Sequence, residues 1–200
     1  MTSVIKWQTG TPVIDKTETL RYMGVRAKIT PELESLADKG IIKVQEAAIC
    51  RGCYIRVPFG KPDESHITIN GEVIETRHLA RHLCGCNEAF LMAATVGVQV
   101  DRLIRATAAY SPADSLAIDA AGSAAVEWVC DELNEHLASI VHSEGKELCR
   151  RFSPGYGDLP LSYQNSMSKL LNMPVNLGIT LSDSLMMFPT KSVTAIIGIK

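Results

Sequence analysis

The chain has 200 residues, a formal net charge of −2 and 46% hydrophobic residues. This size and apolar content suit one self-folding domain, and the near-neutral charge disfavours binding to nucleic acid or to an anionic membrane. The start MTSVIKWQTG lacks the apolar core of a signal peptide, and no apolar stretch approaches the roughly 20 residues that cross a membrane. We therefore expect a cytoplasmic protein whose six cysteines are thiols or ligands rather than a disulfide framework.

The first elements of the chain are predicted from local signals. Residues 1–30 show only short alternating runs, which indicate an extended arm with one short helix. Thr30-Pro31-Glu32 supplies an N-cap, a proline at the first helical position and an acid in the first turn, so a helix follows to about Ala48. Two β-rich runs come next, over 54–59 and 66–74, and Asn70-Gly71 is a turn signal within the second. These runs predict a small sheet edge or hairpin.

The remaining elements alternate between helix and strand without a regular βαβ order. We expect Ser111 to cap the longest helix, and Asp101 and Arg102 to face solvent. The predicted elements are helices over 75–83, 98–110, 112–141 and 162–171, and strands over 88–95, from 176 onward and over 191–199. No phosphate loop or GxGxxG motif follows a strand. The pattern predicts an α+β fold for residues 31–200, a single domain with a largely antiparallel twisted sheet flanked by helices.

Cysteine and histidine residues with the spacing of metal ligands lie in the first half of the chain. The candidates are Cys50, Cys53, His78, His82, Cys84 and Cys86. The first two cysteines are three residues apart, and the two histidines are four apart on a predicted helix, which places them on one face. Their neighbours are apolar, and free cysteine is among the most buried residue types. Packed thiols and a metal or redox centre both stay open, and the later Cys130 and Cys149 show no pairing signal.

Two further features indicate a ligand site. Glu127 interrupts an apolar helical stretch, where an unpaired carboxylate is costly, so it is a rim residue, an ion-pair partner or a contact for a ligand cation or hydroxyl. Residues 151–160 read RFSPGYGDLP, in which prolines fix φ, glycines allow close approach to the backbone, and Arg151 offers a planar fork suited to a carboxylate. This segment fits a clamp for an amino-acid-like ligand or a stiff surface turn with a salt-bridged arginine.

The segment Arg151-Phe-Ser-Pro-Gly-Tyr156 resembles the Arg-x-x-x-Gly-Tyr signature of a known family, the AdoMet-binding activation domain of cobalamin-dependent methionine synthase, in its stand-alone form. Other motifs of that family have counterparts in the same order. They are Ala93–Gly97 and Asp119–Glu127 upstream, and Gly178–Ser184, Pro189 and Ser192-Val193 downstream. The likeness spans about residues 75–200, and the ordered series of motifs is more specific than any single one.

The resemblance implies a reactivation subunit that binds S-adenosylmethionine (AdoMet), while cobalamin is carried by a partner methionine synthase or related corrinoid protein. With an external electron donor, that family returns inactive cob(II)alamin to use by reductive methylation, so the chain would be the AdoMet-binding subunit of a methyltransferase. The implied ligand-binding residues are Glu127, Arg151, Ser153, Pro154, Gly155 and Tyr156. Arg151 would hold the AdoMet carboxylate, and Glu127 would contact a polar group of the ligand. The backbone of the turn would meet the adenine or ribose, and Tyr156 would shape the pocket toward the corrinoid.

Two alternatives remain beside this interpretation. The chain is a docking subunit for a corrinoid protein without AdoMet binding, or it is a metal or redox partner that uses Cys50, Cys53, Cys84 and Cys86. We assign no catalytic residue, because in the fused enzymes the chemistry takes place on the cofactor while the protein binds and orients the donor.

Overall fold

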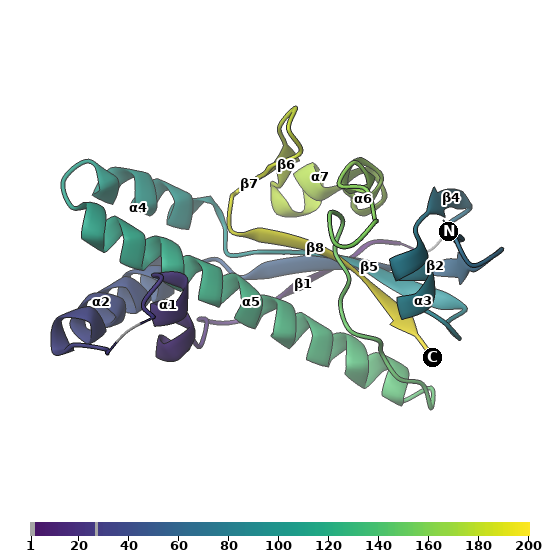
Figure 1. Cartoon of the computed structure of the whole chain (residues 1–200), viewed down its shortest axis with the longest axis horizontal. Coiled ribbons are helices and arrows are strands. Elements are labelled where there is room, and N and C mark those ends of the chain that lie inside the picture. The colour runs from purple at the N-terminus through teal and green to yellow at the C-terminus, as the bar shows by residue number, and fades with distance from the viewer. Residues whose placement is uncertain (1–2, 27) are drawn as a thin grey trace.

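The computed structural model describes residues 3–26 and 28–200. Within these residues the elements form one six-stranded sheet, a two-stranded ribbon and seven helices (Figure 1). In chain order they are β1 (Ile5–Gln8), α1 (Lys16–Tyr22), α2 (Pro31–Ala47), β2 (Arg51–Gly60), β3 (His66–Ile69), β4 (Glu72–Glu75), α3 (Arg77–His82), β5 (Glu88–Thr95), α4 (Val98–Ala108), α5 (Pro112–His142), α6 (Tyr163–Leu171), α7 (Met173–Leu177), β6 (Thr180–Leu181), β7 (Met187–Phe188) and β8 (Ser192–Ile199). The predicted α+β class is confirmed.

The main sheet is antiparallel at every pairing, in the order β4-β3-β2-β5-β8, and β1 also pairs with β2. Strand β5 lies between two long partners: Thr95 pairs with Arg51 of β2 on one side and with Ser192 of β8 on the other. It is buried at all but its first residue, as expected for a central strand. The predicted turn Asn70-Gly71 joins β3 to β4 with positive φ at both residues, as a type I′ hairpin requires.

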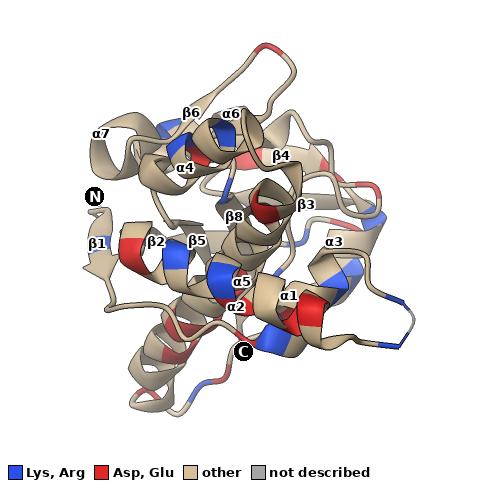
Figure 2. Cartoon of the chain, turned by 90° about the vertical axis from the view of Figure 1, so that its left-hand side faces the viewer, with Lys and Arg blue, Asp and Glu red and all other residues tan. Residues whose placement is uncertain are grey.

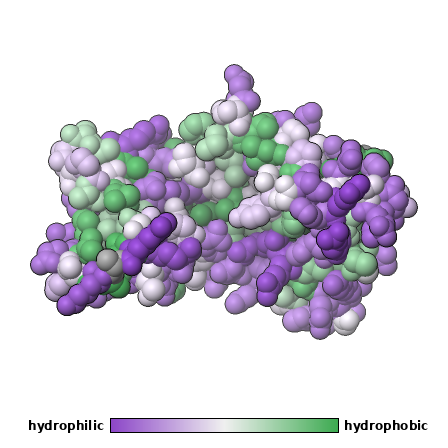
Figure 3. Space-filling view, in the orientation of Figure 1, coloured by the Kyte–Doolittle hydropathy of each residue, from purple (hydrophilic) through white to green (hydrophobic). Residues whose placement is uncertain are grey.

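The two faces of the sheet bury two separate cores. Helix α5 covers one face and packs on Tyr54 and Phe90 of the sheet, and α2 and α4 pack against α5. Helices α3, α6 and α7 cover the other face, where Leu91 and Ile196 point (Figure 1). Successive strand residues thus alternate between the two cores. Charged residues lie on the outer sides of the helices (Figure 2), and hydrophilic and hydrophobic patches are interspersed over one face of the molecule (Figure 3).

The predicted helix starts are confirmed by their caps. The Thr30 hydroxyl accepts a hydrogen bond from the Leu33 amide at 3.4 Å, and the Ser111 hydroxyl accepts one from the Asp114 amide at 3.4 Å. The N-terminal arm contains β1 and α1, the extended segment and the short helix expected there. None of the described helices is long and apolar enough to cross a membrane.

Two local predictions were wrong. The strand expected from residue 176 begins only at Thr180, as the two-residue β6, because Asn172 in the left-handed conformation starts α7, which continues to Leu177. Asp101 does not face solvent: it is 7% exposed and accepts hydrogen bonds from the Thr190 amide at 2.8 Å and the Thr190 hydroxyl at 2.7 Å. Arg102 is exposed as predicted.

Candidate functional site

The segment that carries Arg151 is held against the edge strand β8. The amide of Phe152 donates to the carbonyl of Ile196 at 2.9 Å, and the Ile196 amide donates to the carbonyl of Phe152 at 2.8 Å. Three residues before Phe152, the Cys149 amide donates to the Gly198 carbonyl at 2.9 Å. These bonds fix residues 149–152 beside the sheet, at the point where α5 passes.

Arg151 reaches from this segment to two carboxylates of α5. Its guanidinium donates to Asp131 Oδ1 at 2.7 Å and to Glu127 Oε2 at 3.2 Å. Glu127 and Asp131 are four residues apart and therefore lie on one face of the helix. The Arg151 side chain is 24% exposed, whereas those of Glu127 and Asp131 are 49% and 67% exposed. The group carries one positive and two negative charges and is open to solvent on the carboxylate side.

A pocket of about 250 Å³ opens beside this ion-pair group. We call it the Arg151 pocket, and its lining residues are Glu127, Arg151, Phe152, Ser153, Tyr156 and Val193. A second hollow of about 350 Å³, the α1 hollow, also has Glu127 in its wall. The α1 hollow is lined by Val13, Asp15, Glu18, Arg21, Tyr22, Ala124, Glu127, Trp128 and Asp131. Glu127 is therefore shared by the two hollows, and both carboxylate partners of Arg151 face recessed space.

Four of the six residues predicted for the ligand site line the Arg151 pocket together, namely Glu127, Arg151, Ser153 and Tyr156. The other two shape the turn: Pro154 is buried, and Gly155 has a φ of 89°, a conformation that side chains with a Cβ rarely adopt. The Gly155 amide donates to the Leu159 carbonyl at 2.9 Å, which closes the turn.

Aromatic rings surround the base of this turn. The ring centroids of Phe152 and Tyr156 are 6.5 Å apart, and those of Phe152 and His82 are 5.4 Å apart. The Tyr156 side chain is 69% exposed and available to a molecule outside the chain. The pocket thus combines aromatic side chains with one cation and one carboxylate, groups that suit an amino acid joined to a planar base.

Helix α3 anchors the loop at both ends. Asp158 accepts hydrogen bonds from the Thr76 hydroxyl at 2.6 Å, the Arg77 amide at 2.8 Å and the His78 amide at 3.1 Å. The Thr76 hydroxyl and these amides at the helix N-terminus lower the pKa of Asp158 to about 2. At the other end of α3, His82 Nε2 lies 2.7 Å from the Arg150 carbonyl.

The anchored loop also passes close to the surface of α3. A Cβ on Gly157 would lie 2.4 Å from His78 Nδ1, so a larger residue there would displace the His78 side chain, and the φ of 56° also favours glycine. His78 and His82, predicted as candidate metal ligands, are therefore both placed against the 150–158 loop. They lie at its two ends, where Asp158 and the Arg150 carbonyl are anchored.

Sequence reasoning missed several residues of the site. The four-residue spacing of Glu127 and Asp131 was a signal that could have found Asp131, whereas Phe152 and Val193 had no signal of their own. Asp158 was also missed, because its partners lie about 80 residues away along the chain.

The predicted cysteine set is not brought together. Cys50 lies in the core on the α5 side of the sheet and Cys53 in the core on the other side. Among residues 3–26 and 28–200 there is no group of three or more His, Cys, Asp or Glu side chains placed to hold a metal ion. Cys84 is exposed, and Cys86 instead lies 3.5 Å (Sγ to Sγ) from Cys149, a contact that no sequence pattern indicated.

Comparison with known proteins gives one informative result. No family model matches the sequence, and a search of curated proteins finds no match either. Among solved structures, the chain superposes with a TM-score of 0.74 on one described as "Crystal Structure of the MetH Reactivation Domain bound to AdoHcy". The two are 16% identical in sequence, and the match covers 98% of this chain and 78% of that one. The chain therefore has the fold of the MetH reactivation domain.

Proposed function

We propose that the chain is a stand-alone reactivation subunit that binds AdoMet at the Arg151 pocket and serves a cobalamin-carrying methionine synthase or related corrinoid protein. The observation that supports it most directly is the position of Arg151, held over Glu127 and Asp131 at a pocket lined by the predicted turn. The shared fold with a reactivation domain that was crystallised with AdoHcy adds to this support.

The charges of AdoMet complement those of the site. Its carboxylate suits the bidentate guanidinium of Arg151, and its ammonium and sulfonium groups suit the carboxylates of Glu127 and Asp131. AdoMet carries a net charge of about +1, and the three side chains together carry −1. The flat adenine would lie against the Phe152 and Tyr156 side of the pocket.

The surface around the turn suits contact with a partner. Tyr156 and Leu161 are 69% and 40% exposed, and both lie at or just after the pocket-forming turn. We assign the partner's cobalamin to this side, where a methyl donor in the pocket would be nearest to it. The bound corrinoid would supply the methyl-transfer and redox chemistry, with an external donor giving the electron, while this chain binds and orients AdoMet. We propose that the protein acts in the cytoplasm.

Calorimetric titration tests the binding half of this proposal. The purified chain is titrated with AdoMet, and with AdoHcy and methionine for comparison. We expect saturable binding of AdoMet, lost in Arg151→Ala and retained in Arg150→Ala, a matched control because Arg150 is the exposed neighbour on the same segment. Binding that is equal in the two variants would contradict the assigned site.

The docking interpretation is favoured by one specific observation. Arg151 is already paired with two carboxylates, so its charge does not require a ligand. In that case the chain docks on a corrinoid protein without AdoMet. Co-purification with a cobalamin-loaded partner, unaffected by Arg151→Ala and by omission of AdoMet, would select docking alone. AdoMet-dependent recovery of methyltransferase activity from the cob(II)alamin form would select reactivation.

A further inference from the structure

Two cysteines that are far apart in sequence meet at the start of the segment that carries Arg151. Cys86 Sγ and Cys149 Sγ are 3.5 Å apart. Cys86 is 6% exposed and lies in the turn between α3 and β5, with its amide bonded to the Leu83 carbonyl at 3.1 Å. Cys149 is half-buried and lies two residues before Arg151. The contact therefore joins the α3 end of one core to the backbone of the candidate site.

The backbone beneath the two thiols is bare. A Cβ on Gly198 would lie 2.6 Å from Cys86 Sγ and 3.3 Å from Cys149 Sγ, so both sulfurs rest against this glycine of β8. The Cys149 amide donates to the Gly198 carbonyl at 2.9 Å, which fixes the main chain on one side of the pair. Bonded sulfurs are about 2.05 Å apart, so the two atoms need to approach by only about 1.5 Å to form a bond.

The side chains around Cys86 and Cys149 suit a disulfide rather than a metal site. Among residues 3–26 and 28–200, no third ligand joins the two thiols in a cluster that could hold a metal ion. The nearby Cys84 is exposed. Two thiols in contact, without further ligands, have disulfide formation as their accessible chemistry.

We propose that Cys86 and Cys149 form a reversible disulfide that ties the turn after α3 to the segment carrying Arg151. In the oxidised form this segment is held covalently as well as by its hydrogen bonds to β8. The oxidation state of the pair thereby controls how often residues 149–152 detach from β8. This inference does not depend on which ligand the Arg151 pocket takes.

The oxidant is a low-molecular-weight disulfide such as oxidised glutathione. The Cys149 thiolate, the more accessible of the two, attacks one sulfur of the oxidant, its S–S bond breaks, and one glutathione leaves as a thiol. Burial and the contact with Cys149 raise the pKa of the Cys86 thiol to about 12, so Cys86 acts second. Its sulfur attacks Cys149, the mixed disulfide breaks, and the second glutathione leaves. Two electrons and the two thiol protons pass to the two glutathione molecules.

Redox titration of the full chain tests the pairing. Reduced protein is equilibrated in buffers of graded reduced to oxidised glutathione, its free thiols are trapped, and its peptides are mapped by mass without reduction. We expect a peptide containing Cys86 linked to one containing Cys149, reversed by dithiothreitol, absent in Cys149→Ser and retained in Cys84→Ser. Glutathione on the exposed Cys84 shows within the same sample that the oxidant has reacted. Free Cys86 and Cys149 in that sample, or a link from Cys149 to Cys84, would overturn the proposal.

Hydrogen exchange tests the consequence for the backbone. In the wild-type protein, oxidation is expected to slow exchange of the Cys149 and Phe152 amides at least about tenfold, because opening of the segment then requires movement of the α3 turn. Exchange in Cys149→Ser should not respond to the oxidant. Unchanged exchange in the oxidised wild type, with the disulfide shown by mass, would overturn the tether.

Discussion

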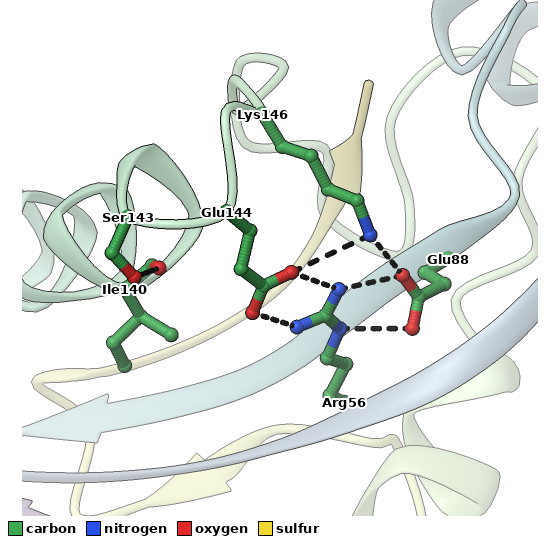
Figure 4. Close-up of polar contacts among 6 residues, drawn as sticks. All are labelled: Arg56, Glu88, Ile140, Ser143, Glu144 and Lys146. Carbon is green, nitrogen blue, oxygen red and sulfur yellow. Dashed lines mark hydrogen bonds and ion pairs between the residues drawn. The ribbon is translucent and has the colours of Figure 1, made fainter.

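Two arginine clusters differ in charge balance: one joins the sheet to the chain that leaves α5, and the other joins α5 to the segment 149–152 beside the sheet. In the first, the Arg56 cluster, the guanidinium donates to Glu88 at 2.9 and 2.6 Å and to Glu144 at 2.6 and 2.8 Å (Figure 4). Lys146 donates to the same Glu88 at 2.8 Å. Two cations face two carboxylates, so the Arg56 cluster is neutral, and it joins β2 and β5 to the chain that leaves α5.

The second cluster, Arg151 with Glu127 and Asp131, has one cation for two carboxylates and lies at a pocket. Its uncompensated negative charge faces the recessed space where a cationic ligand would fit. Under the proposed function, the two clusters have different roles: the balanced Arg56 cluster stabilises the joint between elements, and the unbalanced Arg151 cluster next to a cavity binds a ligand. The predictions below separate the two roles.

The largest effect is expected for Arg151→Ala. Loss of a charge-assisted pair with the ligand carboxylate costs about 2 kcal/mol, so the AdoMet dissociation constant should rise about thirtyfold. Calorimetry measures it. Arg151→Lys should recover part of the affinity, because a lysine keeps the charge but not the bidentate fork. An affinity within twofold of wild type in folded Arg151→Ala would remove the distinction between the clusters.

The Arg56→Ala substitution is expected to lower the stability of the protein without changing its affinity for AdoMet. The variant leaves Glu88 and Glu144 without their main partner, and the melting temperature should fall by about 3 °C, a modest change because these groups are partly exposed. AdoMet affinity should stay at the wild-type value. Thermal unfolding and calorimetry on the same sample check this, and weakened binding without loss of stability would argue against a purely structural Arg56 cluster.

Acid titration compares the loop anchor with the Arg56 cluster. The pKa values of Asp158 and Glu144 are both lowered to about 2 by their hydrogen-bond partners, from ordinary values near 4. Their contribution to stability is therefore full above about pH 5, where both carboxyl groups are ionised even in the unfolded chain, and is lost as the pH falls through about 2.

Substitution should distinguish the role of Asp158 in ligand binding from the purely structural role of Glu144. Asp158→Asn and Glu144→Gln should each flatten this part of the curve of unfolding free energy against pH. At neutral pH only Asp158→Asn should weaken AdoMet binding, about fivefold, since it releases the pocket-forming loop from α3. Equal binding by both variants would show that the anchor does not position the loop.

The smallest effect is expected for Glu127→Gln. The neutral amide keeps the shape of the side chain but removes the excess negative charge. AdoMet affinity should fall about threefold while AdoHcy affinity, for a ligand without the sulfonium charge, changes less. The ratio of the two affinities is the measurement. A ratio equal to that of wild type would mean that charge balance does not distinguish the clusters.

Local signals in the sequence predicted most of the helices and strands and several residues that line the Arg151 pocket. Thr30 and Ser111 marked helix starts because caps act within one turn. Pro154 and Gly155 predicted a turn between Arg151 and Tyr156, which was interpreted as either a ligand clamp or a stiff surface turn with a salt-bridged arginine. The expectation that this turn and Glu127 belong to one site came from the resemblance to the AdoMet-binding family and not from the spacing of residues along the chain.

Contacts across the fold were beyond such reasoning. Asp101 was wrongly placed in solvent because its partner Thr190 is 89 residues away. Asp158 and Cys149 gave no signal for the same reason: their partners lie on α3 and on the turn that follows it. The pairing of strands and loops sets these contacts, and that pairing is a property of the whole chain.

Hydrogen exchange with and without AdoMet is the most direct test of where the ligand binds. We predict slower exchange at residues 127–131 and 151–156 when AdoMet is present, and no change around Arg56 and Glu144. Slower exchange confined to the Arg56 cluster, or saturable binding without protection of 151–156, would contradict the assignment of the AdoMet site to the Arg151 pocket.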